Sequence, residues 1–171
     1  MERVGLLQLG GKDVTVIGPD ITVGMNAPEF TVRTNDWQVV NGLASTQGKV
    51  RIIAAVPSLS TSVCDRETRR FNEEAASLGD DVVVQVVSMD LPPTQKQWCG
   101  NAGVDRVITL SDAYDGNFGE AYGVMIKEWR WFRRATWVVD RNGKVVFSEY
   151  LPALGEEPTY DAVLAAAKAA L

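Results

Sequence analysis

The chain has 171 residues, of which 46% are hydrophobic and 23% charged, and its formal net charge is -5. This length and composition predict one globular domain, residues 1–171, that buries its own core without metal or disulfide staples. The acidic balance argues against nucleic acid as a partner, and the lack of a signal peptide or of 18 uninterrupted apolar residues predicts a cytoplasmic protein that enters no membrane.

The first part of the chain favours β-structure. Residues 6–9 and 14–17 are short β-favouring runs joined through Gly10-Gly11, and they predict a hairpin. Another strand is predicted over residues 31–34. Residues 49–56 are apolar and β-branched without alternation, which is typical of a strand covered on both faces, so we expect this strand near the centre of a sheet.

A long helix is predicted next. Apolar and small side chains recur at three- and four-residue steps over residues 64–78, with Thr61 or Ser62 as the N-cap and Gly79 as the stop. The following residues 82–88 are mostly valine and predict a strand. Strand, helix and strand in this order predict a right-handed parallel crossover.

The second half alternates short helices and strands. Pro92-Pro93 is expected to interrupt regular structure, and Asn142-Gly143 is a strong hairpin signal. The basic and aromatic run at residues 130–134 is interpreted as a loop that leads into a strand. The other elements are expected as helices over residues 94–101, 120–122 and 159–171, and as strands over residues 107–110, 135–140 and 144–149. This order predicts an α/β fold with a central mixed β-sheet, helices on both faces and an N-terminal β-hairpin.

Two cysteines and no histidine limit the chemistry that the chain can perform. They form no disulfide framework, no zinc-ligand spacing and no Cys/His catalytic pair. The predicted strand delivers Cys64 to the first turn of a helix, where unpaired N–H groups and the helix dipole favour a thiolate over a thiol. A reactive sulfur is therefore predicted, although composition alone leaves Cys64 and Cys99 equally open to being inert buried thiols.

The residues around Cys64 resemble a known family. Pro57-x-x-x-Thr61-x-x-Cys64 resembles the active-site pattern of the peroxiredoxins, and residues 57–73 resemble their thiol peroxidase subfamily. Matching blocks at Asp90-Leu91-Pro92, Cys99-Gly100 and residues 107–111 extend the resemblance over nearly the whole chain. It implies a thioredoxin-like fold and a thiol-dependent peroxidase that uses no metal, haem or flavin.

The resemblance also implies a role for each cysteine. Cys64 matches the peroxidatic position, whose thiolate attacks a peroxide oxygen and becomes a sulfenic acid. Cys99 matches the resolving position, so an intramolecular disulfide is expected. If the family's separation of the two sulfurs applies, the segment around one or both cysteines must unfold locally, because a disulfide requires Cα atoms within about 7 Å. Pro92-Pro93 and Gly100 are the expected boundaries of that movement.

Stabilising a thiolate takes more than a helix N-terminus. Lowering the pKa of a free thiol by about two units requires ~2.7 kcal/mol, of which a helix N-terminus contributes about 1 kcal/mol. The family supplies an arginine on a neighbouring strand, and the match Arg-Ala-x-x-Val-x-Asp assigns it to Arg134, while Arg133 would point to the opposite face if the strand has already begun there. Thr61 is expected to hydrogen-bond the sulfur or the peroxide, and Pro57, which has no N–H, to shield the pocket.

The implied partners are hydrogen peroxide and alkyl hydroperoxides as substrates, a thioredoxin-type reductant and a second copy of the chain in a homodimer.

Three residues depart from the subfamily: Ser60 stands where aspartate is common, and Pro93 and Trp98 stand where phenylalanine is common. One alternative remains open, a non-catalytic sensor that passes peroxide oxidation to a protein partner. A general disulfide oxidoreductase is disfavoured, because the chain has no Cys-x-x-Cys pair.

Overall fold

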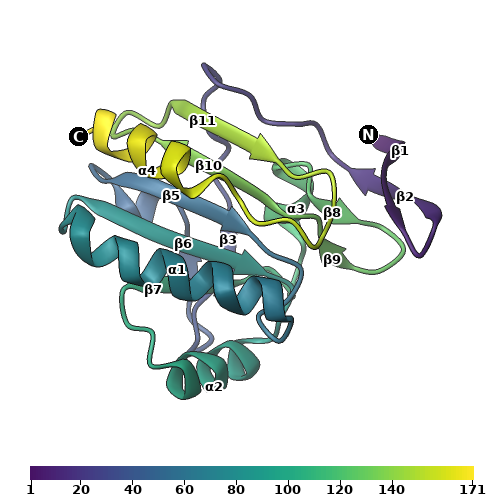
Figure 1. Cartoon of the computed structure of the whole chain (residues 1–171), viewed down its shortest axis with the longest axis horizontal. Coiled ribbons are helices and arrows are strands. Elements are labelled where there is room, and N and C mark those ends of the chain that lie inside the picture. Colours follow the sequence, from purple (N-terminus) through teal and green to yellow (C-terminus); the bar gives the residue numbers. More distant parts are fainter.

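The computed structural model describes residues 1–171 and contains two β-sheets and four α-helices (Figure 1). The strands are β1 (Glu2–Leu9), β2 (Lys12–Ile17), β3 (Thr31–Arg33), β4 (Val39–Asn41), β5 (Val50–Ala55), β6 (Val82–Ser88), β7 (Val107–Ser111), β8 (Met125–Ile126), β9 (Trp131–Phe132), β10 (Ala135–Val139) and β11 (Val145–Tyr150). The helices are α1 (Ser62–Leu78), α2 (Pro92–Ala102), α3 (Asn117–Ala121) and α4 (Tyr160–Ala169), with a short 3-10 helix at Ala44–Thr46.

The larger sheet has seven strands in the order β11-β10-β5-β6-β7-β3-β4. Its centre, β5-β6-β7, is parallel, whereas the strands on both sides join by antiparallel pairing. The sheet is therefore mixed, as predicted, and α1 forms the crossover between β5 and β6. All six residues of β5 are buried, which confirms the strand that was expected to be covered on both faces.

Alternation along β5 sends its side chains into two separate cores. Ile52 and Ala54 face the core that includes residues of α1 and α4, and Ile53 and Ala55 face the core that contains Phe118 of α3. Figure 1 shows α1 and α4 lying across the same face of the sheet. Because each fully buried isoleucine contributes about 1.5–3 kcal/mol, this two-sided burial fixes β5 and the turn that follows it.

Several boundaries differ from the sequence expectation. Helix α2 begins at Pro92 rather than at residue 94, because a proline in the first helical turn lacks only an N–H that would be unpaired there. Helix α3 begins at Asn117, earlier than the predicted residues 120–122. Strands β4, β8 and β9 were not predicted, since two or three residues are too few to show a periodic pattern.

The predicted N-terminal hairpin is present and belongs to the smaller sheet, whose order is β1-β2-β8-β9. Figure 1 shows this antiparallel sheet at one end of the larger one. Its small core consists of Leu7, Val14 and Ile126, with Trp131 and Leu154 packed against it. Residues 133–134 lie between β9 and β10, so they join the two sheets.

Candidate active site

Cys64 is the third residue of α1, and its side chain is completely buried. Residues 56–61 turn the chain from β5 into this helix, and Thr61 is the N-cap with an extended backbone (φ -85°, ψ 148°). The first N–H groups of a helix have no acceptor within it, and with the helix dipole they favour negative charge. The fold thus places the sulfur at the positive end of the helix dipole and away from bulk water.

A guanidinium group lies against this sulfur. Nη2 of Arg134 donates a hydrogen bond to Cys64 Sγ at 3.3 Å, and the Arg134 side chain is itself buried. Nη2 also donates to the carbonyl oxygen of Leu154 at 3.0 Å, and Nη1 donates to the carboxylate of Glu67. Three acceptors around one planar group hold the cation in a single orientation toward Cys64.

Arg134 and Glu67 form an ion pair that is shielded from solvent. Burial lowers the pKa of Arg134, but the negative charges of Glu67 and Cys64 outweigh it, so the net pKa lies above that of an ordinary arginine. Burial raises the pKa of Glu67 to about 7, although the neighbouring Arg134 acts in the opposite direction. Arg134 is therefore a permanent cation beside the sulfur, and Glu67 anchors it.

Glu67 is a site residue that sequence reasoning missed. It lies three residues after Cys64 and four before Phe71, on the face of α1 that meets the core, and it is fully buried. A carboxyl group at such a position needs a charged or hydrogen-bonding partner. Its place in the helical repeat was the signal that could have identified it.

The neighbouring Arg133 points away from the cysteine. Its Nε donates to the carbonyl oxygen of Gly123 at 3.0 Å, Nη2 donates to Asp20, and the guanidinium carbon lies 4.2 Å from the centre of the Tyr150 ring. Adjacent residues of an extended segment point to opposite sides. The structure therefore separates the two arginines as the sequence predicted, with Arg134 at the cysteine and Arg133 in a structural cluster.

The turn before α1 contains the other two predicted site residues. Pro57 is buried and lies two residues after the end of β5. The hydroxyl of Thr61 donates to the carbonyl oxygen of Ser58 at 3.0 Å, and it makes no side-chain cap bond and no hydrogen bond to Cys64. Thr61 is thus the N-cap residue, as predicted, but its hydroxyl bonds Ser58 instead of a helix N–H group, and its lone pairs are left to accept a bond from a ligand.

Asp90 ties this turn to the sheet. Its carboxylate accepts hydrogen bonds from Ser58 Oγ at 2.6 Å, from the Leu59 N–H at 2.8 Å and from Ser88 Oγ at 2.8 Å. Ser60 Oγ lies 2.8 Å from Ser58 Oγ and extends the same network. Bonds to an ionised carboxylate are among the stronger ones in proteins, so Asp90 orders the segment that leads into Cys64.

Cys99 lies on α2 in a different polar setting. Its Sγ is 3.3 Å from Thr109 Oγ1 and 3.8 Å from Asn35 Nδ2, and both cysteines are free thiols. Strands β5 and β6 separate β10, which follows Arg134, from β7, which carries Thr109. Three strand spacings amount to about 14 Å, so the two sulfurs contact distant parts of the sheet.

Comparison with known proteins shows the family of this chain. The family model described as Redoxin matches residues 22–164. The chain is 52% identical over 159 residues to a thiol peroxidase of Bacillus subtilis (strain 168), a match that covers 93% of this chain and 94% of the relative. It is 48% identical over 161 residues to a thiol peroxidase of Halalkalibacterium halodurans, covering 94% and 96% of the two chains. This chain belongs to the thiol peroxidases of the Redoxin family. It is accordingly a thiol-dependent peroxidase, an oxidoreductase.

Solved structures agree with the assignment to this family. A peroxiredoxin-like protein from Aquifex aeolicus superposes with a TM-score of 0.87 at 38% identity, covering 98% of this chain and 99% of the other. A thiol peroxidase from Chromobacterium violaceum has a TM-score of 0.80 at 23% identity, covering 92% of each chain, and it shares the fold. The predicted thioredoxin-like fold is confirmed.

The three departures of this thiol peroxidase from its subfamily all have local roles. Ser60 belongs to the Asp90 network, and Pro93 lies in the first turn of α2. The indole N–H of Trp98 donates to Asp65 Oδ1 of α1 at 3.0 Å, and Arg69 lies over its ring. Trp98 therefore joins α2 to α1 in addition to adding apolar bulk beside Cys99.

None of the helices has the length and hydropathy that crossing a membrane would require.

Proposed function

We propose that this thiol peroxidase works with two cysteines, Cys64 as the peroxidatic residue and Cys99 as the resolving residue of the same chain. The observation that carries the proposal is the buried Arg134 guanidinium, anchored by Glu67 and Leu154, at 3.3 Å from Cys64 Sγ. A buried cation fixed against a cysteine at a helix N-terminus favours the thiolate, which is the nucleophilic form of a thiol.

The first step oxidises Cys64. Its thiolate attacks one oxygen of the hydroperoxide, a sulfur–oxygen bond forms and the oxygen–oxygen bond breaks, and the leaving oxygen takes up a proton as water or an alcohol. Arg134 stabilises the charge that moves from sulfur to the leaving oxygen. Thr61 accepts a hydrogen bond from the peroxide O–H, since its own proton is donated to Ser58, and Pro57 offers no competing N–H.

The second step consumes the sulfenic acid. Cys99 attacks the oxidised sulfur of Cys64, the sulfur–oxygen bond breaks, and the hydroxyl leaves as water with the Cys99 proton. A thioredoxin-type dithiol then reduces the disulfide by thiol–disulfide exchange and restores both thiols. Hydrogen peroxide and alkyl hydroperoxides are the proposed substrates.

Mass spectrometry after one equivalent of hydrogen peroxide tests this pairing. We expect one Cys64–Cys99 disulfide within each wild-type chain. In Cys99→Ser we expect one round of oxidation, with a trapped sulfenic acid at Cys64, and a loss of nearly all thioredoxin-linked turnover, because the reductant has no disulfide to attack.

Two results would contradict this prediction. A disulfide between two chains in the wild-type protein would exclude resolution within one chain. Consumption of peroxide that stops at one equivalent in the presence of thioredoxin, its reductase and NADPH would instead favour the non-catalytic sensor. Continuous consumption is the expected result.

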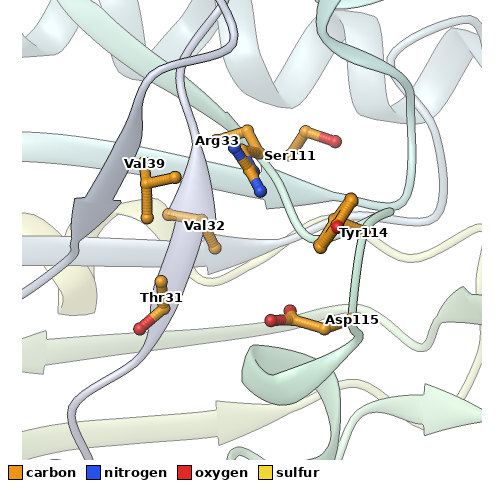
Figure 2. Close-up of a pocket in the computed structure, with 7 residues that line it drawn as sticks. All are labelled: Thr31, Val32, Arg33, Val39, Ser111, Tyr114 and Asp115. Carbon is orange, nitrogen blue, oxygen red and sulfur yellow. The ribbon is translucent and has the colours of Figure 1, made fainter.

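A homodimer is also part of the proposal. A hollow between β3 and the loop after β7 is lined by Thr31, Val32, Arg33, Val39, Ser111, Tyr114 and Asp115 (Figure 2). Trp37, Leu91 and Tyr114 are exposed at or beside it, and exposed apolar side chains around a hollow mark interaction sites. A second copy is the proposed occupant because Arg33 and Asp115 share the hollow, so a two-fold arrangement brings opposite charges of the two copies together.

Replacing Leu91 by glutamate is expected to dissociate this dimer. Sedimentation velocity should show a dimer for the wild-type protein and a monomer for Leu91→Glu, because a charge cannot be buried unpaired in an apolar contact. Val4→Glu, an equally drastic change at an exposed valine of the N-terminal hairpin, should leave the dimer intact. A monomeric wild-type protein, or a dimeric Leu91→Glu variant, would contradict the proposed interface.

We further place the protein in the cytoplasm. The support is that the chain has only two cysteines and so lacks the disulfide framework that is typical of small secreted domains. Recovery of the protein from an oxidising compartment after cell fractionation would contradict this placement.

A further inference from the structure

Cys99 is held by two polar side chains that no step of the proposed reaction uses. Asn35 lies in the turn between β3 and β4, and Thr109 lies on β7. The Thr109 hydroxyl donates to Asn35 Oδ1 at 2.9 Å, so its lone pairs remain to accept the Cys99 S–H, with oxygen and sulfur 3.3 Å apart. Asn35 Nδ2 donates to the same sulfur at 3.8 Å. The reduced thiol thus has both a donor and an acceptor.

The second half of helix α2 has no fully buried side chain, and apart from the contacts of Cys99 it is attached through the partly buried Trp98, which bonds Asp65 of α1. Only Pro92 and Gln95 among its 11 residues are buried, whereas α1 has six buried residues among 17. Gln95 Nε2 donates to Ser88 Oγ at 3.0 Å and to the Leu110 carbonyl oxygen at 2.9 Å, which secures the first turns of α2. Segments with few buried side chains open at low cost, so the part of α2 after Gln95 is expected to open more easily than α1.

The movement of Cys99 must break its contacts with Asn35 and Thr109. Those contacts lie on β7 and beside β3, whereas Cys64 is held by Arg134 on the far side of β5 and β6. A disulfide needs the two sulfurs about 2.05 Å apart. The hydrogen bonds of Cys99 therefore exist in the dithiol form and are lost when the disulfide forms.

We infer that Asn35 and Thr109 are positioning residues that hold the resolving thiol in its docked place and so set how readily α2 opens toward oxidised Cys64. This inference rests on the proposed Cys64–Cys99 pairing. The step that it controls is the attack of Cys99 on the sulfenic acid, in which the sulfur–sulfur bond forms, the sulfur–oxygen bond breaks and the hydroxyl leaves with the Cys99 proton as water. Loosening the hold speeds this step and makes the disulfide harder to reduce.

Asn35→Ala and Thr109→Val remove the two side chains one at a time. A net hydrogen bond of ~1 kcal/mol corresponds to about a fivefold change in the opening equilibrium. We expect disulfide formation after a rapid mix with hydrogen peroxide, followed by acid quenching and mass spectrometry, to become about fivefold faster in each variant. The reduction potential of the cysteine pair should fall by about 21 mV, which is a fivefold change for a two-electron couple.

The matched controls are Asp36→Asn and Thr109→Ser. Asp36 lies next to Asn35 and forms an exposed ion pair with Lys96 of α2 at 2.6 Å, which is worth little, so its neutralisation should change neither quantity. Thr109→Ser keeps the hydroxyl and should retain the wild-type potential. Thermal unfolding of each variant identifies damage to the fold, which alone would not shift the potential of the cysteine pair in this direction.

The outcomes separate this inference from the proposed function. A wild-type disulfide with unchanged rates and potentials in Asn35→Ala and Thr109→Val would overturn the inference alone. Slower disulfide formation in these variants would also overturn it, because Asn35 and Thr109 would then activate Cys99 rather than hold it. A wild-type chain that forms no Cys64–Cys99 disulfide would overturn the proposed pairing and the inference with it.

Discussion

The Cys64→Ser variant is expected to lose peroxide turnover, with kcat/KM for hydrogen peroxide falling on the order of 10⁴-fold or more, as when other catalytic nucleophiles are removed. A serine hydroxyl does not ionise near neutral pH, so the N-terminus of α1 and the Arg134 guanidinium have no anion to stabilise. The substitution exchanges one buried atom for a smaller one and should leave the fold intact. The measurement is NADPH oxidation coupled through thioredoxin reductase and thioredoxin, with hydrogen peroxide and an alkyl hydroperoxide as substrates.

The control for this experiment is the other cysteine. Under single-turnover conditions, the Cys99→Ser variant should still consume one equivalent of peroxide at the wild-type rate. The reason is that replacing Cys99 does not alter the contact between Arg134 and Cys64. A Cys64→Ser variant that turns over like the wild-type protein would show that another group reacts with peroxide. The proposed mechanism would then be wrong at its first step.

Arg134→Lys is expected to slow the oxidation of Cys64 by about 10²–10³-fold, the usual effect of losing one well-placed stabilising donor. Lysine keeps the charge, but its ammonium group is not a planar fork and cannot engage Glu67, Leu154 and Cys64 in the same geometry. The measurement is stopped-flow oxidation by hydrogen peroxide under single-turnover conditions. The rate at which iodoacetamide alkylates Cys64 should fall as well, because it reports the thiolate.

Arg133→Lys is the matched control, since the two arginines are adjacent and both are buried. Arg133 contacts Gly123, Asp20 and Tyr150 instead of the cysteine, so replacing it is expected to lower stability but to leave the oxidation rate at the wild-type value. Thermal unfolding of both variants separates the two effects. Equal oxidation rates in Arg134→Lys and Arg133→Lys would contradict the role proposed for Arg134.

Because Arg134 is paired with the buried Glu67, replacing Arg134 affects the thermal stability of the protein as well as its oxidation rate. The carboxyl group of Glu67 is fully buried, and a lysine ammonium beside it keeps the charge but not the planar arginine contact, so Arg134→Lys is expected to destabilise the fold. Where Arg134→Lys unfolds too readily, the double change Arg134→Gln with Glu67→Gln removes both charges of the buried pair. This double variant should recover thermal stability without recovering the oxidation rate, so the catalytic and structural effects of Arg134 remain distinguishable.

Much of the fold could be predicted from the sequence because the signals are local. An apolar run without alternation identifies β5, a valine-rich run identifies β6, the repeat over residues 64–78 identifies α1, and Asn142-Gly143 identifies the β10–β11 hairpin. The start of α2 was predicted wrongly because two local rules compete, since Pro92-Pro93 interrupts a helix in its interior but begins one at its first turn. Thr61 was predicted as an N-cap, but only the structure shows that its hydroxyl bonds the Ser58 carbonyl oxygen instead of the helix N–H groups.

The sequence by itself determined that a cysteine stands at the start of a helix after a buried strand, and that Arg133 and Arg134 point to opposite sides. Periodicity decides both, since each depends only on residues close along the chain. Only the tertiary structure decided that Arg134 is anchored by Glu67 and Leu154, and that Cys99 is held by Asn35 and Thr109. These contacts join segments far apart in sequence, and their geometry follows from strand order and packing, which no local pattern specifies.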